Sequence, residues 1–375
     1  MVRSQSQTSL AFSFGLAAGL LVLFGLLALS SAGAVVGFQK YHDTYYYFKH
    51  QLFFGVIPGA LAAFLFSRIP YLTWKRWAQP LFVATLVLLV MVLVPGLGGR
   101  VISGAKSWFV VSGISFQPTE LLKLTLIFFL ARWIEQRGAH RLHTWRDGAL
   151  PFAMIIGIIT ILIALQPDVG SLILIIAFSS TLFFVGGANL KHLAVFGGIG
   201  ALLLVLAIAV APYRLNRLQV FINPQYDPQG AGYHMHQAMI AIGSGGIFGR
   251  GFGHSRQKFS YLPEVVNDSL FAVIAEELGF VLTAVVVGLW ILLLLKGMRI
   301  ARSCPNSFGR FAVGGITLWF FFQFFLNVGA MLGIVPLTGL PLPLMSYGGS
   351  AMMTELAAVG FVFNVATTLP KGALK

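Results

Sequence analysis

Four carboxylates lie close together in YLPEVVNDSLFAVIAEELG, the stretch formed by residues 261–279. They are Glu264, Asp268, Glu276 and Glu277. Asp268 directly precedes an apolar run, where partial desolvation at the aqueous edge makes a carboxylate a better proton acceptor. The pattern therefore indicates a general base at Asp268, although Asn267 or Asp268 could instead cap the following helix. Glu276 and Glu277 lie about two turns inside the run, and we expect them to pair with Arg or Lys from the preceding loop.

Three further ionisable side chains lie in apolar surroundings. Glu120 and Lys123 are three residues apart in SFQPTELLKLTLIFF, which places them on one helix face. Two interpretations of this pair stay open, a neutralising structural ion pair or a contact with substrate. Asp168 in ALQPDVGSL is expected to form a turn and cap the next helix. Glu355 is isolated in the last apolar run, and its spacing indicates no partner.

The segment before Asp268 is rich in glycine and basic residues. It carries Arg214, Arg217, His234, His236 and Lys258. Glycine-rich backbone beside basic side chains can cradle phosphate, but this spacing matches neither the dinucleotide fingerprint nor the P-loop. The alternative is a flexible connection. The two histidines are two residues apart, a spacing that does not place them on one helix face, so this pair does not predict a metal site.

The elements that must position these residues are membrane helices. The chain is 57% hydrophobic and 10% charged, whereas about a quarter of the residues in a soluble domain are charged. Apolar runs of about 20 residues, long enough to span a bilayer, recur along the whole sequence. We predict a single all-α, polytopic membrane domain over residues 1–375 with about ten spans. These spans fall near 10–36, 50–67, 77–96, 117–134, 150–166, 168–187, 192–212, 268–295, 308–334 and 345–368.

The distribution of positive charge predicts the orientation. The short loops on one side hold only Lys40, Lys49, Arg100 and Lys106, while most other Lys and Arg fall on the opposite side. Because cytoplasmic loops carry the excess of Lys and Arg, both termini are expected in the cytoplasm. The long segment 213–267, between the seventh and eighth spans, is then extracytoplasmic. Topology accounts for the net charge of +14, so no nucleic-acid partner is expected.

Two loops on the outer side complete the candidate cavity. GGRVISGAKSWFVVSGISFQP is too polar to span and carries Trp108, a residue type common at membrane interfaces, beside Lys106. PLTGLPLPLMSYGGS, residues 336–350, is predicted to form a rigid re-entrant turn. Its Ser346 is not expected to be a nucleophile, because no Ser-x-x-Lys or Gly-x-Ser-x-Gly motif surrounds it. These residues predict a polar cavity facing outward, which either an enzyme or a transporter could have.

Several long motifs resemble the SEDS family, the FtsW, RodA and SpoVE proteins of bacterial cell-wall synthesis. The resemblance is carried by DPQGAGYHMHQAMIAIGSGGIFGRGFGHSRQKFSYLPEVVNDSLFAVIAEELGF, NVGAMLGIVPLTGLPLPLMSYGGS, GAKSWFVVSGISFQPTELLKL and LQPDVGS, in this family's order. GHSRQKFSYLPE is more similar to the division-type FtsW branch than to the elongation-type RodA branch. The resemblance implies a peptidoglycan glycosyltransferase that polymerises lipid II outside the membrane and releases undecaprenyl diphosphate.

The resemblance also implies residue roles. The family's essential acid falls on Asp268, and its loop Trp, implicated in contact with the lipid substrate, falls on Trp108. This chain departs from the common His-Thr-Asp-Phe pattern, because residues 266–269 read Val-Asn-Asp-Ser. The contribution of the usual His must then be absent or supplied from elsewhere in the chain.

Forming a β-1,4 link from an α-linked diphosphate inverts the anomeric centre and requires a base for the acceptor hydroxyl. Asp268 is assigned this role. Lys123, Arg214 and Lys258 are assigned to the departing diphosphate. Glu120, Glu264 and Ser346 are counted with Trp108 among the residues that bind substrate. A divalent cation, Mg²⁺ or Mn²⁺, held by Asp268 or Glu264 is compatible with this chemistry, and no organic cofactor is expected.

The expected partners are lipid II, the growing glycan strand, a class B penicillin-binding transpeptidase and other membrane proteins of the divisome or elongasome. The expected location is the bacterial cytoplasmic membrane, with the active site facing outward. One alternative is a lipid II flippase, although paired interrupted spans typical of inverted-repeat transporters are not visible. A RodA-like polymerase and a scaffold for the transpeptidase are the others. A scaffold would tolerate loss of Asp268 and Lys123, whereas an enzyme would not.

Overall fold

The structure is a computed structural model that describes residues 2–94, 99–102, 105–111, 114–210, 219–223, 227, 229–230 and 232–370. Helices dominate it. The main helices are α1 (Val2–Tyr41), α2 (Tyr46–Gln51), the π-helical turn η1 (Leu52–Val56), α3 (Ile57–Arg68), α4 (Tyr71–Leu93), α5 (Pro118–Leu142), the π-helical turn η2 (Trp145–Ala149), α6 (Leu150–Ala164), α7 (Val169–Val185), α8 (Leu190–Val210), α10 (Tyr233–Gly245), α11 (Leu270–Ser303), α12 (Ser307–Met331) and α13 (Gly349–Thr367).

A helix or a helical run covers most of each range that the sequence predicts to span the membrane. In the part of the chain that the structure describes, seven runs are long and apolar enough to cross a bilayer. They are Ser9–Tyr41, Tyr46–Arg68, Tyr71–Leu93, Trp145–Ala164, Leu270–Ser303, Ser307–Met331 and Gly349–Thr367. The protein is therefore a multi-pass membrane protein. That α5, α7 and α8 also span, which would bring the total to ten, stays a prediction.

The prediction of an all-α membrane protein holds for most of the described residues, but the loop that carries Trp108 is not helical. This loop forms an antiparallel sheet of β1 (Gly99–Ile102), β2 (Ala105–Val111) and β3 (Ile114–Phe116), in the order β1-β2-β3. In the sequence, Ser-Gly pairs at 103–104 and 112–113 separate short runs rich in β-branched and aromatic residues. Such runs with turn residues between them are typical of hairpins. The polarity of this loop correctly excludes a span, but the hairpin signal was missed.

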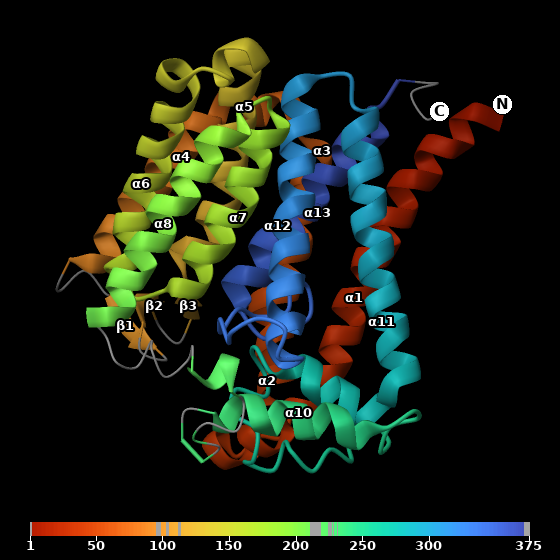
Figure 1. The fold of residues 1–375 in the computed structure, drawn as a ribbon. Helices are drawn as coiled ribbons and strands as arrows, with labels where there is room; N and C mark the ends of the chain where they lie inside the picture. Colours follow the sequence, from red (N-terminus) through yellow and green to blue (C-terminus); the bar gives the residue numbers. More distant parts are fainter. Residues whose placement is uncertain are drawn as a thin grey trace.

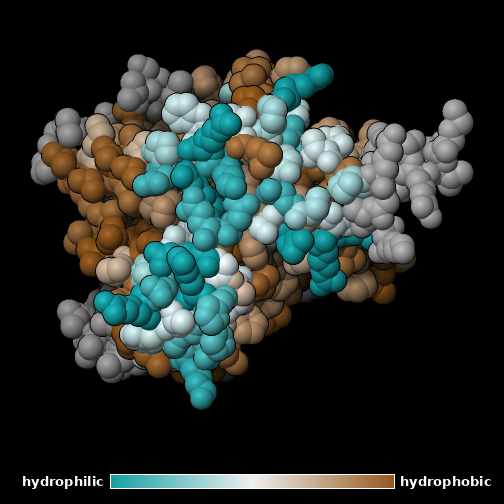
Figure 2. Space-filling view, turned by 90° about the horizontal axis from the view of Figure 1, so that it is seen from above, coloured by the Kyte–Doolittle hydropathy of each residue, from teal (hydrophilic) through white to brown (hydrophobic). Residues whose placement is uncertain are grey.

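The two ends of the molecule differ. In Figure 1, the start of α1 and the end of α13 lie at one end, while α10 and the small sheet lie at the other. Figure 2 views the end with the termini from above and shows hydrophilic side chains across its middle and hydrophobic ones around much of its rim. An apolar rim around a polar face is what a bundle surrounded by lipid requires.

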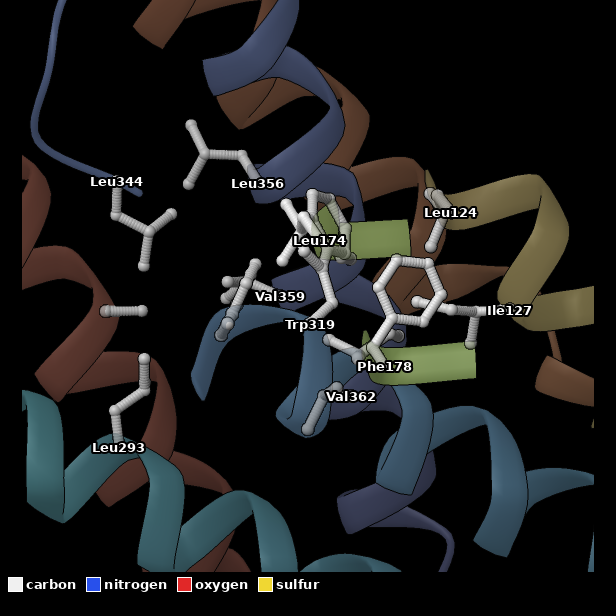
Figure 3. Close-up of a cluster of buried hydrophobic side chains, with 14 of the residues drawn as sticks. Leu124, Ile127, Leu174, Phe178, Leu293, Trp319, Leu344, Leu356, Val359 and Val362 are labelled. Atoms are coloured by element: carbon white, nitrogen blue, oxygen red, sulfur yellow. The ribbon is translucent and has the colours of Figure 1, made fainter. Parts of the chain in front are cut away.

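The core lies where α12 and α13 meet α5 and α7. Figure 3 shows this interior around the fully buried Trp319, with side chains contributed by several helices. Those labelled include Leu124 and Ile127 of α5, Leu174 and Phe178 of α7, and Val359 and Val362 of α13. Close packing relies on small residues, as in many membrane bundles. At Gly360 of α13, for example, an added Cβ would lie 2.2 Å from the carbonyl oxygen of Ala63 in α3, so only glycine permits this approach.

Candidate active site

Asp268 lies in the turn that leads into α11, at the end of the molecule that carries α10. Helix α11 begins at Leu270 with Ser269 at its N-cap position, so the expectation that residue 267 or 268 is the N-cap is wrong. The residue is buried, with 6% of its surface exposed. The side chain of Asp268 is therefore largely enclosed by protein.

The backbone around Asp268 is held by the segment between α12 and α13. The carbonyl oxygens of residues 266–268 accept hydrogen bonds, in order, from the backbone N–H of Tyr347 (2.9 Å), the hydroxyl of Ser346 (2.5 Å) and the side-chain amide of Asn327 (2.8 Å). Three consecutive carbonyls are thus fixed by groups distant in sequence. These hydrogen bonds fix the backbone position from which the Asp268 side chain extends.

The segment between α12 and α13 is buried over residues 342–346 and is cross-linked by hydrogen bonds. Asn327 donates a second bond to the Leu340 carbonyl (2.8 Å), and the Ser346 hydroxyl accepts one from the Leu342 N–H (3.0 Å). Burial raises the pKa of the Tyr347 phenol above its ordinary value, so the hydroxyl stays protonated and can donate to His50 Nδ1, 3.0 Å away. Ser346 therefore supports the shape of the site, and nothing in its hydrogen bonds suggests activation as a nucleophile.

A histidine faces the Asp268 carboxylate from α10. The Nε2 atom of His234 lies 4.0 Å from Asp268 Oδ1 and 2.6 Å from the Ser269 hydroxyl oxygen. Sequence analysis noted His234 only as one of two histidines in the outer loop. The sequence leaves open whether the contribution of the replaced His is absent or supplied from elsewhere, and the fold places His234 beside Asp268.

The other residues assigned to substrate lie around this end or outside the described residues. Glu264 is exposed on the same turn, with a left-handed φ of 49°, and accepts a hydrogen bond from the Asn267 amide. Trp108 is half-buried on β2, where it pairs in register with Arg100 of β1. Arg214 and Arg217 fall outside the described residues.

Lys123 and Glu120 form the expected ion pair deep inside the bundle. Lys123 Nζ lies 2.7 Å from Glu120 Oε2, and the side chains are 0% and 4% exposed. The ammonium also donates to Gln323 Oε1 (3.3 Å) and lies 5.3 Å from the centre of the Trp319 ring. Of the two interpretations left open, the geometry favours a structural ion pair, because the ammonium is enclosed by protein.

This buried cluster also contains the partner of Glu355 that spacing could not indicate. Gln323 donates to Glu355 Oε1 (3.3 Å) and to the Pro341 carbonyl (3.0 Å). The other oxygen of Glu355 accepts a hydrogen bond from the Leu344 N–H (2.7 Å). The cluster therefore supports the same segment that holds the backbone of Asp268.

Glu276 and Glu277 pair with loop residues, as the sequence predicts. Lys258 Nζ lies 2.9 Å from Glu277 Oε1, and Arg250 Nε lies 3.6 Å from Glu276 Oε1. Lys258 donates its other two hydrogen bonds to the Ser31 hydroxyl (2.9 Å) and the Gly253 carbonyl (2.7 Å). A lysine has three donors, so the whole ammonium of Lys258 is engaged within the protein. This geometry favours a structural role over contact with a diphosphate.

The glycine-rich run is tied to α11 by backbone hydrogen bonds and is not a loose connection in this structure. Helix α11 is interrupted at Gly279 (φ 71°, ψ −176°). Backbone N–H groups of residues 250–251 donate to the carbonyls of 276–277, and those of 280–281 donate to the carbonyls of 246–247, at 2.9–3.1 Å. The loop thereby satisfies polar groups that the break in the helix would otherwise leave unbonded.

Glycine is required on both sides of this contact. A Cβ at Gly279 would lie 2.1 Å from the Gly249 nitrogen, and a Cβ at Gly249 would lie 2.2 Å from the Glu277 carbonyl oxygen. Both residues also have positive φ, which glycine adopts without steric cost. The backbones of the loop and α11 thus touch directly, and the contact orients the short first part of α11 beside α10 (Figure 1).

Asp168 caps α7, as predicted. Its Oδ1 accepts a hydrogen bond from the Ser171 N–H (3.1 Å), and its Oδ2 accepts one from the Gln117 side chain (3.0 Å). The second bond joins the start of α7 to the start of α5. This acid is therefore part of the framework.

Within the ranges that the structure describes, no group of three or more His, Cys, Asp and Glu side chains is placed to hold a metal ion. Asp268 faces His234, and Glu264 is turned toward Asn267. The described side chains thus do not make a complete ligand set for the cation considered in the sequence analysis.

Fold and site together define a multi-pass helical membrane protein with a carboxylate held at one end of its bundle. The profile of a family described as "Cell cycle protein", comprising FtsW, RodA and SpoVE, matches residues 12–371. The chain is 39% identical to stage V sporulation protein E of Bacillus subtilis over 92% of this chain and 94% of that protein. It is 37% identical to a probable peptidoglycan glycosyltransferase FtsW of Trichlorobacter lovleyi, over 93% and 91%. The chain belongs to this family.

Solved structures agree with that assignment. A chain from work described as "Structural coordination of polymerization and crosslinking by a peptidoglycan synthase complex" matches with a TM-score of 0.77 and 32% identity, over 95% of this chain and 97% of that one. Rod shape determining protein RodA of Thermus thermophilus matches with a TM-score of 0.69 and 30% identity, over 94% and 95%. The helical arrangement is therefore shared along nearly the whole length.

Proposed function

We propose that this chain is a peptidoglycan glycosyltransferase that polymerises lipid II into β-1,4-linked glycan strands and releases undecaprenyl diphosphate. Family membership supports the activity, and relatives named FtsW support a role in cell division. The observation that carries the proposal for this chain is Asp268. Its backbone is held at three consecutive carbonyls while its side chain is largely enclosed by protein.

The proposed orientation places α10, the small sheet and Asp268 outside the cytoplasmic membrane and both termini inside. The excess of Lys and Arg in the loops at the end with the termini supports it. In this arrangement residues 1–375 form one membrane domain of ten spans, and residues 213–267 form an extracytoplasmic segment that includes α10.

The chemical step requires one base. The 4-hydroxyl oxygen of the acceptor GlcNAc attacks C1 of the donor sugar from the face opposite the diphosphate. The new O4–C1 bond forms as the bond from C1 to the diphosphate oxygen breaks, which inverts the anomeric centre. Asp268 takes the hydroxyl proton, and undecaprenyl diphosphate leaves with the bonding electrons.

The departing diphosphate requires positive charge. Of the three basic residues assigned to it, Lys123 and Lys258 hold carboxylates inside the protein. We therefore propose that these two support the site through the α12–α13 segment and through α11. Arg214 stays the predicted contact with diphosphate, and Trp108, Glu120, Glu264 and Ser346 stay predictions as residues that bind or shape the substrate site.

A divalent cation also stays a proposal. The described side chains do not form a complete ligand set, so we assign no step to it. Polymerisation measured in EDTA, and then with Mg²⁺ or Mn²⁺ restored, tests whether a cation is needed.

The proposed protein partner is a class B penicillin-binding transpeptidase. The support is the structural match to a chain of a peptidoglycan synthase complex in which polymerization and crosslinking are coordinated. Other membrane proteins of the division machinery are expected around this pair. Measuring polymerisation with and without the transpeptidase tests whether the partner is required.

The function is tested by incubating the purified protein with fluorescent lipid II, with and without its transpeptidase, and separating products by size. We expect polymer from the wild type and none from Asp268→Ala. Asp147→Asn, an exposed acid in the α5–α6 turn, is the matched control and should polymerise normally. Absence of polymer from the wild type, together with movement of lipid II across liposomes, would favour a flippase instead.

A further inference from the structure

We infer that His234 is a positioning residue for the Asp268 carboxylate. The inference rests on the proposed function, which makes Asp268 the base, and adds a residue from a different element to its immediate surroundings. His234 comes from α10, and Asp268 precedes α11. The contact is therefore made by the fold and not by neighbouring positions in the sequence.

Hydrogen bonds around Ser269 determine which nitrogen of His234 carries a proton. The Ser269 hydroxyl donates to the Pro263 carbonyl oxygen at 2.8 Å. A hydroxyl has one hydrogen, so toward His234 Nε2, at 2.6 Å, the same oxygen can only accept. Nε2 must then carry the proton, which fixes the tautomer of the neutral ring. This proton is directed to the Ser269 oxygen, and the Nε2 nitrogen that carries it lies 4.0 Å from Asp268 Oδ1.

An oriented N–H is useful at this position because the last torsion of an aspartate side chain is soft. The hydrogen bonds from the α12–α13 segment hold the backbone of Asp268 but leave this torsion to its surroundings. His234 borders one carboxylate oxygen, Oδ1, with a positive N–H edge. Near the other oxygen, Oδ2, lies Gly339, where an added Cβ would be 4.0 Å away. The imidazole therefore biases the carboxylate toward one orientation.

The alternative is that His234 serves only to stabilise the turn through Ser269. The two roles predict different kinetics. Loss of a positioning group lowers kcat more than it raises KM, because the misoriented base fails in the transition state. A purely structural residue would change the amount or stability of folded protein and leave the kcat of the folded fraction unchanged.

The experiment compares three variants of the full-length protein in the lipid II polymerisation assay. His234→Ala removes the N–H, His234→Gln restores an N–H donor near the position of Nε2, and His236→Ala is the control on the same helix at an exposed position. We expect His234→Ala to lower kcat on the order of 10- to 100-fold with little change in KM. His234→Gln should recover most of the loss, and His236→Ala should match the wild type.

Several results would overturn the inference. They are wild-type kcat in His234→Ala, no recovery in His234→Gln, or a loss confined to KM or to the folded fraction. If His234→Ala does not fold, His234→Gln and Ser269→Ala test the inference instead. Ser269→Ala leaves the imidazole but removes the hydroxyl that anchors it. This variant should lower kcat less than tenfold without raising KM.

A second readout does not depend on polymerisation and so separates this inference from the proposed function. In protein labelled with ¹⁵N-histidine, the wild type should show a His234 Nε2–H signal that shifts in Asp268→Asn, while the His236 signal stays in place. A His234 signal that is indifferent to Asp268→Asn would refute the contact whether or not polymer forms. Absence of polymer from the wild type with this shift present would reject only the proposed function.

Discussion

The two acidic sites of residues 264–277 have opposite surroundings, although they lie on one short stretch of chain. Glu276 and Glu277 are buried among donors that neutralise or bind both carboxylates, including Lys258 and the Ser255 hydroxyl. Asp268 faces the ring of His234, and its hydrogen bonds to Asn327 are made by its backbone carbonyl. The first site holds two segments together, whereas the second holds the carboxylate that we propose as the base. An acid beside an apolar run can therefore serve either purpose, and its partners decide which.

Removing the lysine of the structural site tests the comparison with the largest expected effect. Lys258→Met leaves the Glu277 charge buried without its counter-ion, which should lower the free energy of unfolding by about 3–5 kcal/mol. The double variant Lys258→Met/Glu277→Gln removes that charge and should regain most of the stability. Denaturation followed by tryptophan fluorescence measures both. Wild-type stability in Lys258→Met, with polymerisation lost, would move Lys258 to the substrate site.

Lengthening the acid of the other site tests positioning without changing charge. Asp268→Glu keeps the carboxylate but displaces it by about one methylene group, so kcat should fall by about 10²-fold, or about 2.7 kcal/mol, with unchanged stability. Initial rates at saturating lipid II measure this. Full activity would mean that the site tolerates a displaced base and that the hydrogen bonds around residues 266–268 do not serve positioning.

Gly279→Ala tests the direct contact between the loop and α11. The new methyl group would lie 2.1 Å from the Gly249 nitrogen at a positive φ, and the strained backbone alone costs about 1–3 kcal/mol. The matched control is Gly288→Ala on the same helix, where an added Cβ meets no atom within 4 Å. We expect a lower melting temperature only for Gly279→Ala. Equal stability of the two variants would contradict the close contact.

The smallest effect is expected at an exposed ion pair. Lys49 Nζ lies 2.9 Å from Asp43 Oδ2, and both side chains are substantially accessible to solvent. Water screens such pairs, so Lys49→Ala should leave stability and polymerisation within experimental error of the wild type. A clear loss in either would show that distance alone, without burial, suffices to make an ion pair structural in this protein.

The helices were predictable because an apolar run of about 20 residues is long enough to span a bilayer as a helix and fits few other structures. The range near 308–334 coincides closely with α12, and the range near 77–96 overlaps most of α4, which begins six residues earlier. The sheet was missed because its strands are short, and the turn residues between them rather than a long apolar run mark it. The contact between Gly279 and Gly249 was missed because the two residues are 30 positions apart in the sequence. Local sequence patterns do not indicate contacts between such distant positions.

The site was predictable in part for the same physical reason. Asp268 is marked by its local sequence and by the family resemblance, so it could be identified from the sequence. His234 reaches it only through the packing of α10 against α11. Lys258 was assigned to diphosphate because the sequence does not show whether the ammonium of a lysine in an outer loop is exposed or enclosed. Its contacts with Glu277, Ser31 and Gly253 are visible only in three dimensions.

The most direct test of the account compares Asp268→Asn with Glu277→Gln, measuring polymerisation rate and melting temperature on the same preparations. Asp268→Asn should lose activity by about 10²- to 10⁴-fold, the range for a general base, at an unchanged melting temperature. Glu277→Gln should melt earlier while its folded fraction polymerises lipid II at a rate close to that of the wild type. Asp268→Asn that polymerises normally, or that loses activity only because it unfolds, would contradict the central claim that Asp268 performs chemistry.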